Sequence, residues 1–221
     1  MNKECHCRSL AKKAIFKRGD CMKKLINSAE DVVTESLEGF ILANHNKVKK
    51  VDGVNGITRK EINEKKVNIV VGGGSGHEPV FIGLIGEGMA DGAALGNVFT
   101  SPDPNTIYKV IKAVNSEKGV LCIIINYAGD TMNFNAAIDL GQLEGINVDS
   151  VLVTDDVASA SKGNEHERRG VAGLLLVTKI TGAAAEQGMS LSDLTQLAEK
   201  VNRNIRTLSV ALTPCSLPGS K

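Results

Sequence analysis

Apolar residues are arranged along this sequence in two kinds of pattern that alternate. Residues 67–71, 119–126 and 148–154 are short, almost unbroken apolar runs rich in β-branched side chains, which are typical of buried strands. Between the runs, apolar side chains recur at i, i+3, i+4 and i+7, most clearly after Pro104, and this spacing predicts helices. Buried strands that alternate with helices predict an α/β fold, with a mainly parallel or mixed sheet flanked by helices on both faces.

Local signals place the ends of several further elements. Ser28 and Asp31 have the spacing of a capping box ahead of an apolar helical face, and Ser190 and Asp193 repeat it before the last helix. Residues 44–65 are polar and contain glycine, so we expect a loop or a weak hairpin there. The remaining expected elements are helices over about 28–43, 133–144 and 169–187, and a fourth strand over 206–212.

Composition argues against several classes of protein. The formal net charge is +1 and only 3% of the residues are aromatic, so a basic, base-stacking surface is absent and nucleic acid is not an expected partner. No apolar run approaches the roughly 18 residues of a membrane span. The N-terminus lacks the apolar core of a secretory signal, so we expect a cytoplasmic protein without membrane contact. Five scattered cysteines, an odd number, favour a reducing compartment.

Metal binding is not predicted. Cys5, His6, Cys7 and Cys21 gather near the N-terminus, but adjacent ligands lack the C-x2-4-C spacing that wraps a tetrahedral zinc ion. Elsewhere, carboxylates and histidines do not cluster at ligand spacing. No metal and no cofactor are therefore expected on this chain.

The glycine-rich stretch VVGGGSGHEPV, residues 70–80, follows a predicted strand and is the strongest candidate for a binding loop. A nucleotide P-loop has Lys and then Ser or Thr directly after its last glycine, but Gly76 is followed by His77 and Glu78. It also fails the dinucleotide pattern G-x-G-x-x-G and the nucleophile pattern G-x-S-x-G, because His77 or Pro79 occupies the last glycine position. We therefore expect neither phosphate binding nor acyl transfer through Ser75.

Two side chains after predicted strands are candidates for acid/base chemistry. His77 lies among small residues, so its imidazole either transfers protons or only hydrogen-bonds the loop backbone. Asp130 follows the strand over 119–126 and either caps the next helix or faces His77 across the end of the sheet as an acid/base partner. The carboxylates of Asp155 and Asp156 are expected mainly in turns or caps.

Seven stretches in order resemble the substrate-binding (K) subunit of dihydroxyacetone kinases and the equivalent domain of single-chain enzymes. The resemblance covers residue 22 to about 218, which predicts one substrate-site domain over 22–221, with residues 1–21 as an extension outside it. The stretches are MKKLINSAEDVV, GGGSGHEP, GEGMADGAALGNVFTSPDPNTI, NYAGDTMNF, TDDVA, RRGVAG and KITGAAAEQG.

The resemblance implies phosphorylation of dihydroxyacetone in glycerol catabolism. Carried over by position, Gly74, Ser75, Gly76 and His77 line the dihydroxyacetone site, His77 acts as the base, and Asp130 contacts the reacting hydroxyl. The phosphoryl group is expected from ADP or ATP with magnesium on a nucleotide-binding L-type subunit or domain. An M-type subunit of the sugar phosphotransferase system and a second copy of the chain are further expected partners.

The chain departs from the family pattern at three places. Ile125 stands where relatives commonly have a lysine, and Ala128 where they have a threonine. The family anchors its substrate covalently through a histidine in a GIHGEPG-like segment, which the resemblance places beyond Lys221. We therefore expect a truncated form that lacks this anchor and has little or no kinase activity alone.

Two other interpretations stay open. The changes at Ile125 and Ala128 are compatible with a non-catalytic paralogue that binds dihydroxyacetone and acts as the co-activator of a transcription factor. A remnant that does not fold stably is the third, because apolar surface meant for a second domain would be exposed.

Overall fold

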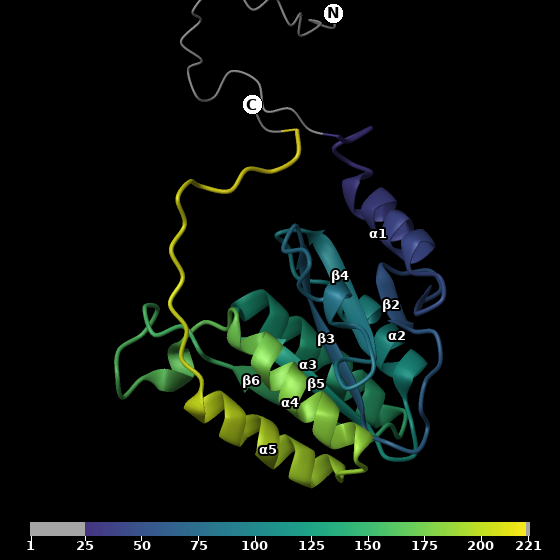
Figure 1. Ribbon diagram of the computed structural model, residues 1–221, viewed down its shortest axis with the longest axis vertical. Helices are drawn as coiled ribbons and strands as arrows, with labels where there is room; N and C mark the ends of the chain where they lie inside the picture. Colours follow the sequence, from purple (N-terminus) through teal and green to yellow (C-terminus); the bar gives the residue numbers. More distant parts are fainter. Residues whose placement is uncertain (1–24, 220–221) are drawn as a thin grey trace, which may run out of the picture.

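Six strands form one mixed sheet in the computed structural model, which describes residues 25–219 (Figure 1). The strand order is β1-β2-β4-β3-β5-β6. β3 pairs in parallel with β4 and β5, and β6 pairs in parallel with β5, whereas the β1–β2 and β2–β4 pairs are antiparallel. The strands are β1 Val48–Lys50, β2 Gly56–Arg59, β3 Asn68–Ser75, β4 Gly92–Val98, β5 Val120–Ile125 and β6 Val148–Val153.

Helices cover both faces of the sheet, as Figure 1 shows. On one face, α2 (Pro104–Val114) and α3 (Ala128–Leu143) pack against one apolar cluster. On the other face, α4 (Gly173–Glu186) and α5 (Leu191–Asn204) form a second cluster, to which α1 (Val32–Ala43) contributes Leu37. Short 3-10 helices lie at Ile82–Leu84 and Glu165–Glu167. The predicted α/β fold is confirmed.

Strand β3 shows how the sequence produces two cores. Ile69 and Val71 belong to the cluster beneath α4 and α5, whereas Val70 belongs to the cluster beneath α2 and α3. Successive side chains of a strand point to opposite faces, so a continuous apolar run is needed wherever both faces are covered. Each of these three side chains is fully buried.

Two helix starts differ from the predictions. The Ser28 hydroxyl accepts a hydrogen bond from the Glu30 N–H, so it forms a local turn, and α1 begins at Val32 without a side-chain cap. The helix expected from about residue 133 begins at Ala128, which places Asp130 in its first turn. By contrast, Ser190 accepts from the Asp193 N–H and caps α5 as predicted.

Strand β4 was not predicted, because its sequence GAALGNV consists mostly of small residues with weak strand preference. Small residues are required there because α2 packs closely on the strand. A Cβ added at Gly92 would lie 2.8 Å from a methyl carbon of Val110. The strand therefore has few of the large apolar side chains that would have revealed it.

The predicted strand over residues 206–212 is wrong. Thr207 forms an isolated bridge with Asp156, and the chain beyond it is irregular as far as the structure describes it. The side chains of Leu208, Val210 and Leu212 are exposed, so the apolar alternation has no sheet face to cover. We call residues 207–219 the C-terminal tail. It runs from the end of α5 to the start of α1 (Figure 1).

The helices between residues 25 and 219 are too short or too polar to cross a membrane. Within the same range, histidine, cysteine and acidic side chains do not gather in groups of three or more that could hold a metal ion. Cys5, His6, Cys7 and Cys21 lie outside the described residues.

Candidate functional site

The glycines at the end of β3 are required by the protein's own packing. A Cβ at Gly72 would lie 2.6 Å from the carbonyl oxygen of Ala94, and one at Gly73 would meet the ring of Phe81. A Cβ at Gly74 would lie 2.6 Å from the backbone nitrogen of Thr100. The glycine run thus allows close contact with β4 and with the loops around it, in addition to any ligand.

Gly76 and His77 form the turn that leaves β3. Gly76 has a φ of 94°, a left-handed conformation that side chains other than glycine adopt only under strain. The Nδ1 atom of His77 lies 2.8 Å from the carbonyl oxygen of Gly74. Since a carbonyl can only accept, Nδ1 carries the proton in the neutral ring and Nε2 has a free lone pair. The backbone contact and the function as a base, which the sequence left as alternatives, are thus compatible.

Asp130 lies in the first turn of α3, where the helix dipole favours a negative charge. Its side chain is buried, with the residue only 7% exposed, and its Oδ1 atom has no hydrogen-bond partner. Burial raises the pKa of this carboxyl, while the Ser101 hydroxyl and the charge of His77 act against that rise. A buried acceptor without a partner is unusual and points to a donor that a ligand would supply.

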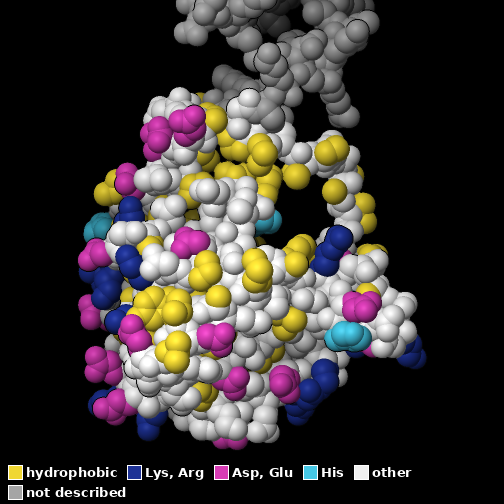
Figure 2. Space-filling view, turned by 180° about the vertical axis from the view of Figure 1, so that it is seen from behind, with side chains coloured by type: hydrophobic (Ala, Val, Ile, Leu, Met, Phe, Trp, Pro, Cys, Tyr) yellow, Lys and Arg dark blue, Asp and Glu magenta, His cyan; other side chains and the backbone are white. Residues whose placement is uncertain are grey.

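His77 and Asp130 line one cavity of about 690 Å³ at the carboxyl ends of β3 and β5. Ligands of open α/β sheets bind at this edge. Figure 2 shows an opening between the C-terminal tail and the body of the molecule. The other residues of the wall are Gly74, Gly76, Val80, Phe81, Phe99, Ser101, Ile125, Tyr127, Gly170, Val171, Ala172, Leu174 and Cys215. We call this space the main cavity.

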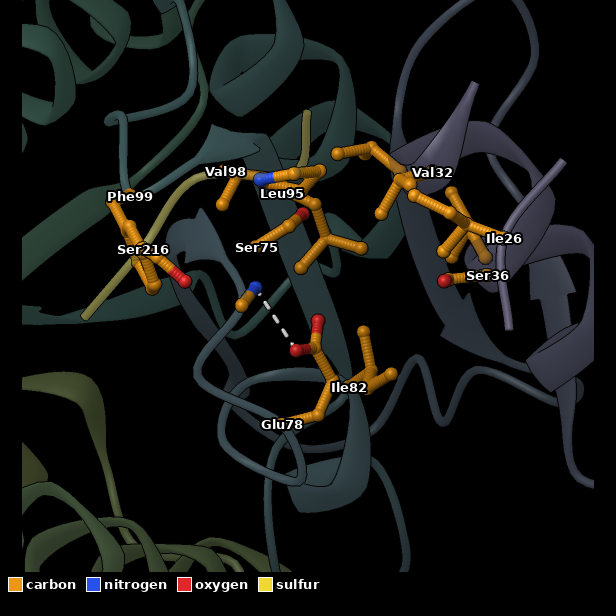
Figure 3. Close-up of a pocket in the computed structure, with 14 residues that line it drawn as sticks. Ile26, Val32, Ser36, Ser75, Glu78, Ile82, Leu95, Val98, Phe99 and Ser216 are labelled. Carbon is orange, nitrogen blue, oxygen red and sulfur yellow. Dashed lines mark hydrogen bonds between the residues drawn. The ribbon is translucent and has the colours of Figure 1, made fainter. Parts of the chain in front are cut away.

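Of the predicted glycine-loop residues, Ser75 is placed elsewhere. Its hydroxyl donates to the carbonyl oxygen of Gly96 at 2.8 Å, and it lines a second pocket behind the loop. This pocket of about 260 Å³ is mostly apolar and lies between the loop and α1, with Val32 and Ser36 on its α1 side (Figure 3). Glu78 points into it and accepts from the Gly76 N–H at 2.9 Å, which holds the turn from behind (Figure 3).

Several wall residues of the main cavity were not singled out from the sequence. Ser101 follows β4, the strand that was not predicted, so no pattern placed it at a strand end. Tyr127 lies two residues beyond the end of β5 at Ile125, and burial raises the pKa of its phenol. Cys215 comes from the C-terminal tail, far along the sequence from β3 and β5. Tyr127 could have been found from the sequence, because it comes just after a predicted strand. Cys215 follows no predicted strand or motif, so there was no reason to select it from the sequence.

Asp155 holds the wall formed by residues 170–172. Its carboxylate is fully buried and accepts from the N–H groups of Val171 at 2.9 Å and Gly173 at 2.8 Å, at the start of α4. The expected capping function is therefore confirmed, although the capped helix is distant in sequence. The same carboxylate accepts from the Thr207 hydroxyl and so fixes the start of the tail.

The loop before this wall is held by backbone carbonyls. Asn126 donates its amide to the carbonyl oxygens of Arg168 at 2.7 Å and His166 at 3.1 Å. The guanidinium of Arg168 donates to the carbonyl oxygen of Ala160, so Arg168 stabilises the loop ahead of α4. These contacts join β5 to the loop whose end lines the main cavity.

Comparison with known proteins identifies relatives over most of the chain. A family model described as the Dak1 domain matches residues 38–221. The dihydroxyacetone-binding subunit DhaK of the PTS-dependent dihydroxyacetone kinase 1 of Listeria innocua is 47% identical over 197 residues. That match covers 89% of this chain and 60% of the relative. The chain therefore spans less than two thirds of the relative's length.

Solved structures include relatives of two kinds. The native dihydroxyacetone kinase of C. freundii superposes with a TM-score of 0.84 at 35% identity, covering 91% of this chain and 37% of that one. A dihydroxyacetone kinase operon co-activator, Dha-DhaQ, superposes with a TM-score of 0.70 at 41% identity, covering 75% of this chain and 51% of that one. Both likenesses confirm the fold and the family resemblance.

Proposed function

The chain belongs to the Dak1 domain family, and we propose that it binds dihydroxyacetone as the substrate-site part of a dihydroxyacetone kinase. The proposal rests on one observation: His77 and Asp130 both line the main cavity. Residues 22–221 form the first, substrate-site domain in this proposal. The names of the Listeria innocua and C. freundii relatives support the same substrate.

The two side chains have complementary functions in the proposed reaction. The free Nε2 of His77 accepts the proton of the substrate hydroxyl as the oxygen attacks phosphorus. When the ketone first binds, the unpartnered Oδ1 of Asp130 accepts the one hydrogen bond that this hydroxyl can donate and so orients it, and the proton passes to His77 only as the oxygen attacks. Gly74 and Gly76 line the cavity beside them and leave the loop backbone open to a small polar ligand.

The phosphoryl donor belongs to a partner in this proposal. ADP or ATP with magnesium is held by a nucleotide-binding L-type subunit or domain, which approaches the open side of the main cavity. The same proposal includes two further partners. An M-type subunit of the sugar phosphotransferase system rephosphorylates the nucleotide, and a second copy of the chain forms a dimer with the first. The failure of residues 70–80 to match the nucleotide patterns supports it.

Calorimetric titration with dihydroxyacetone tests the proposed substrate. We expect the wild-type chain to bind dihydroxyacetone, and Asp130→Asn to bind it about tenfold to hundredfold more weakly, because a hydrogen bond to a charged group contributes about 1.5–3 kcal/mol. Asp139→Asn is the matched control, because Asp139 is exposed on the same helix. Equal affinity of the Asp130 and Asp139 variants, or no binding by the wild type, would contradict the proposal.

A second candidate function is ketone-dependent co-activation of a transcription factor. The likeness to the co-activator Dha-DhaQ favours it, as does Ile125, which lines the main cavity where relatives commonly have a lysine. A pull-down with the regulator encoded nearest to the gene, with and without dihydroxyacetone, distinguishes the two functions. Ketone-dependent capture without phosphorylation in a complemented extract supports co-activation, whereas turnover supports the kinase.

A further inference from the structure

Two phenylalanines beside the glycine loop have a left-handed backbone. Phe81 has a φ of 67° and Phe99 a φ of 56°, and among residues 25–219 they are the two non-glycine residues with positive φ. A bulky side chain is strained in this region, so it stays there only where surrounding contacts hold it. Strain of this kind concentrates at functional sites, so an observed outlier raises the question of what its side chain does.

Phe81 is the central residue of a γ-turn. Its φ of 67° and ψ of −74° are those of the rare, strained form of this turn. The Ile82 N–H closes the turn by donating to the carbonyl oxygen of Val80 at 3.1 Å. The ring lies against the end of β3, where a Cβ added at Gly73 would be 2.3 Å from it. The turn therefore places the ring directly on the glycine run.

Phe99 directly follows β4 and is tied to β3. Its N–H donates to the carbonyl oxygen of Ser75 at 2.9 Å, and a Cβ added at Gly76 would lie 2.8 Å from its ring. Phe99 and Gly76 are the two residues that line both the main cavity and the second pocket. Figure 3 shows Phe99 at one side of the second pocket. The ring is therefore part of the wall that separates the two spaces.

Both rings meet the imidazole of His77 edge to face. The centroid of the Phe99 ring lies 5.3 Å from that of the imidazole, with an angle of 74° between the planes. For the Phe81 ring the distance is 6.4 Å and the angle 78°. Aromatic rings prefer this arrangement. The two strained phenylalanines of the described chain thus contact the same imidazole.

Apolar packing explains the two rings unequally. Phe81 is 2% exposed and belongs to the core cluster beneath α4 and α5, so its ring also stabilises the fold. Phe99 is 40% exposed, so burial alone gives little reason to keep a phenylalanine in a strained conformation. The contact with His77 supplies the missing reason for Phe99.

We propose that Phe99 is a positioning residue for His77. The hydrogen bond from Nδ1 to Gly74 fixes one nitrogen, but a single bond leaves the imidazole plane free to tilt about it. The Phe99 ring, together with that of Phe81, removes this freedom and keeps Nε2 directed into the main cavity.

The expected effect is on rate more than on affinity. A base held in one orientation is close to the proton that it accepts for a larger fraction of the time. Affinity for the ketone depends mainly on Asp130, which neither phenylalanine holds. This consequence rests on the proposed function, whereas the placement of the imidazole is a property of the free chain.

The test compares four variants of the full chain. Phe99→Leu removes the ring and keeps an apolar side chain, whereas Phe99→Tyr keeps the ring. Phe99→Asn is a second ring-free variant that tolerates a left-handed backbone, for use if leucine prevents folding. Phe40→Leu is the matched control, because Phe40 is a partly buried phenylalanine on α1 that packs against the core.

The tautomer of His77 is measured first, without ligand, by NMR of chains labelled with ¹⁵N in histidine. The signals that disappear in His77→Asn are those of His77. At a pH where the ring is neutral, we expect one tautomer, protonated at Nδ1, in the wild type, Phe99→Tyr and Phe40→Leu. Both tautomers should appear in Phe99→Leu, because the tilted ring loses its bond to Gly74.

The second measurement uses dihydroxyacetone. With a nucleotide-binding partner, kcat should be about tenfold to hundredfold lower in Phe99→Leu, while the Kd from calorimetry changes about threefold at most. Phe99→Tyr should restore kcat.

A single Nδ1 tautomer and a wild-type kcat in a folded ring-free variant would refute the positioning function. An equal loss of kcat in Phe99→Tyr would also refute it, because the ring would not be the cause. If the wild type fails to bind dihydroxyacetone, the proposed function is wrong, and the tautomer measurement still decides whether Phe99 positions the imidazole.

Discussion

The Nδ1 atom of His77 lies 2.8 Å from the carbonyl oxygen of Gly74, three residues earlier in the same loop. The contact fixes the tautomer and leaves Nε2 as the basic nitrogen. His45 makes a similar contact, with Nδ1 at 3.1 Å from the carbonyl oxygen of Leu42. His45 is exposed and is not part of the main cavity, so the two histidines differ in their access to a ligand.

Replacing His77 by asparagine should separate loop structure from chemistry. The asparagine amide can still donate to Gly74, so we expect an unchanged melting temperature. Loss of Nε2 removes the base, and in complex with a nucleotide-binding partner we expect phosphorylation about 100-fold slower or more. Binding of dihydroxyacetone by calorimetry should weaken about tenfold through the lost hydrogen bond. His45→Asn should alter neither rate nor affinity, and a similar loss there would show that the effect is structural.

Replacing Asp130 by asparagine should change how stability depends on pH. Burial raises the pKa of the Asp130 carboxyl in the folded protein. Such a group stabilises the fold in acid and loses that contribution as the pH rises through the raised pKa, because the buried carboxylate is then charged. Asp130→Asn stays neutral, so it should be more stable than the wild type at neutral pH, by about 2–4 °C in Tm for each kcal/mol gained.

Thermal melts between acidic and neutral pH measure this difference. The advantage of Asp130→Asn should shrink as the pH falls below the raised pKa, and Asp139→Asn should show no such trend. A wild-type chain that is more stable than Asp130→Asn at neutral pH would mean that a donor already pairs with the carboxylate.

The glycine run should tolerate substitution according to what surrounds each position. In Gly74→Ala, the new methyl group would lie 2.6 Å from the backbone nitrogen of Thr100, which cannot move without displacing the loop after β4. We expect weaker binding of dihydroxyacetone and a loss of about 1–3 kcal/mol in the free energy of unfolding. Gly86→Ala is the control, because no heavy atom lies within 4 Å of the added carbon. Denaturant unfolding and calorimetry measure the two effects. Equal losses in Gly74→Ala and Gly86→Ala would contradict the packing argument.

A buried ion pair at the opposite end of the sheet should matter for stability alone. The Lys66 ammonium lies 2.6 Å from the carboxylate of Asp91, and both side chains are almost completely buried. Asp91 also accepts from the Ile69 N–H and from the guanidinium of Arg59, so it joins β2, β3 and β4.

Asp91→Asn leaves the Lys66 charge buried with its main partner neutral, and we expect a loss of about 3–5 kcal/mol in the free energy of unfolding. Glu144→Gln breaks the exposed pair with Lys112 and should cause no measurable change. Urea unfolding of the three chains tests this, and affinity for dihydroxyacetone should be retained wherever the chain is folded. A small effect of Asp91→Asn would show that water reaches Lys66.

The sequence by itself determined the elements whose signals are local. The apolar runs of β3, β5 and β6, the helix start at Pro104 and the cap at Ser190 depend on neighbours in the chain, so they can be recognised without knowledge of the fold. His77 and Asp130 could be proposed for the same reason, because each follows such a run. The ordered motifs also identified the family, since their residue types and spacing are independent of coordinates.

Only the tertiary structure decided what depends on contacts between distant segments. The small residues of β4 have weak intrinsic preference and form a strand because α2 and β3 pack against them. Residues 206–212 have the apolar alternation of a strand but find no partner for it in the described structure. The unpartnered oxygen of Asp130 and the approach of Cys215 both arise from strand order and from the path of the tail, because burial and proximity are properties of packed surfaces.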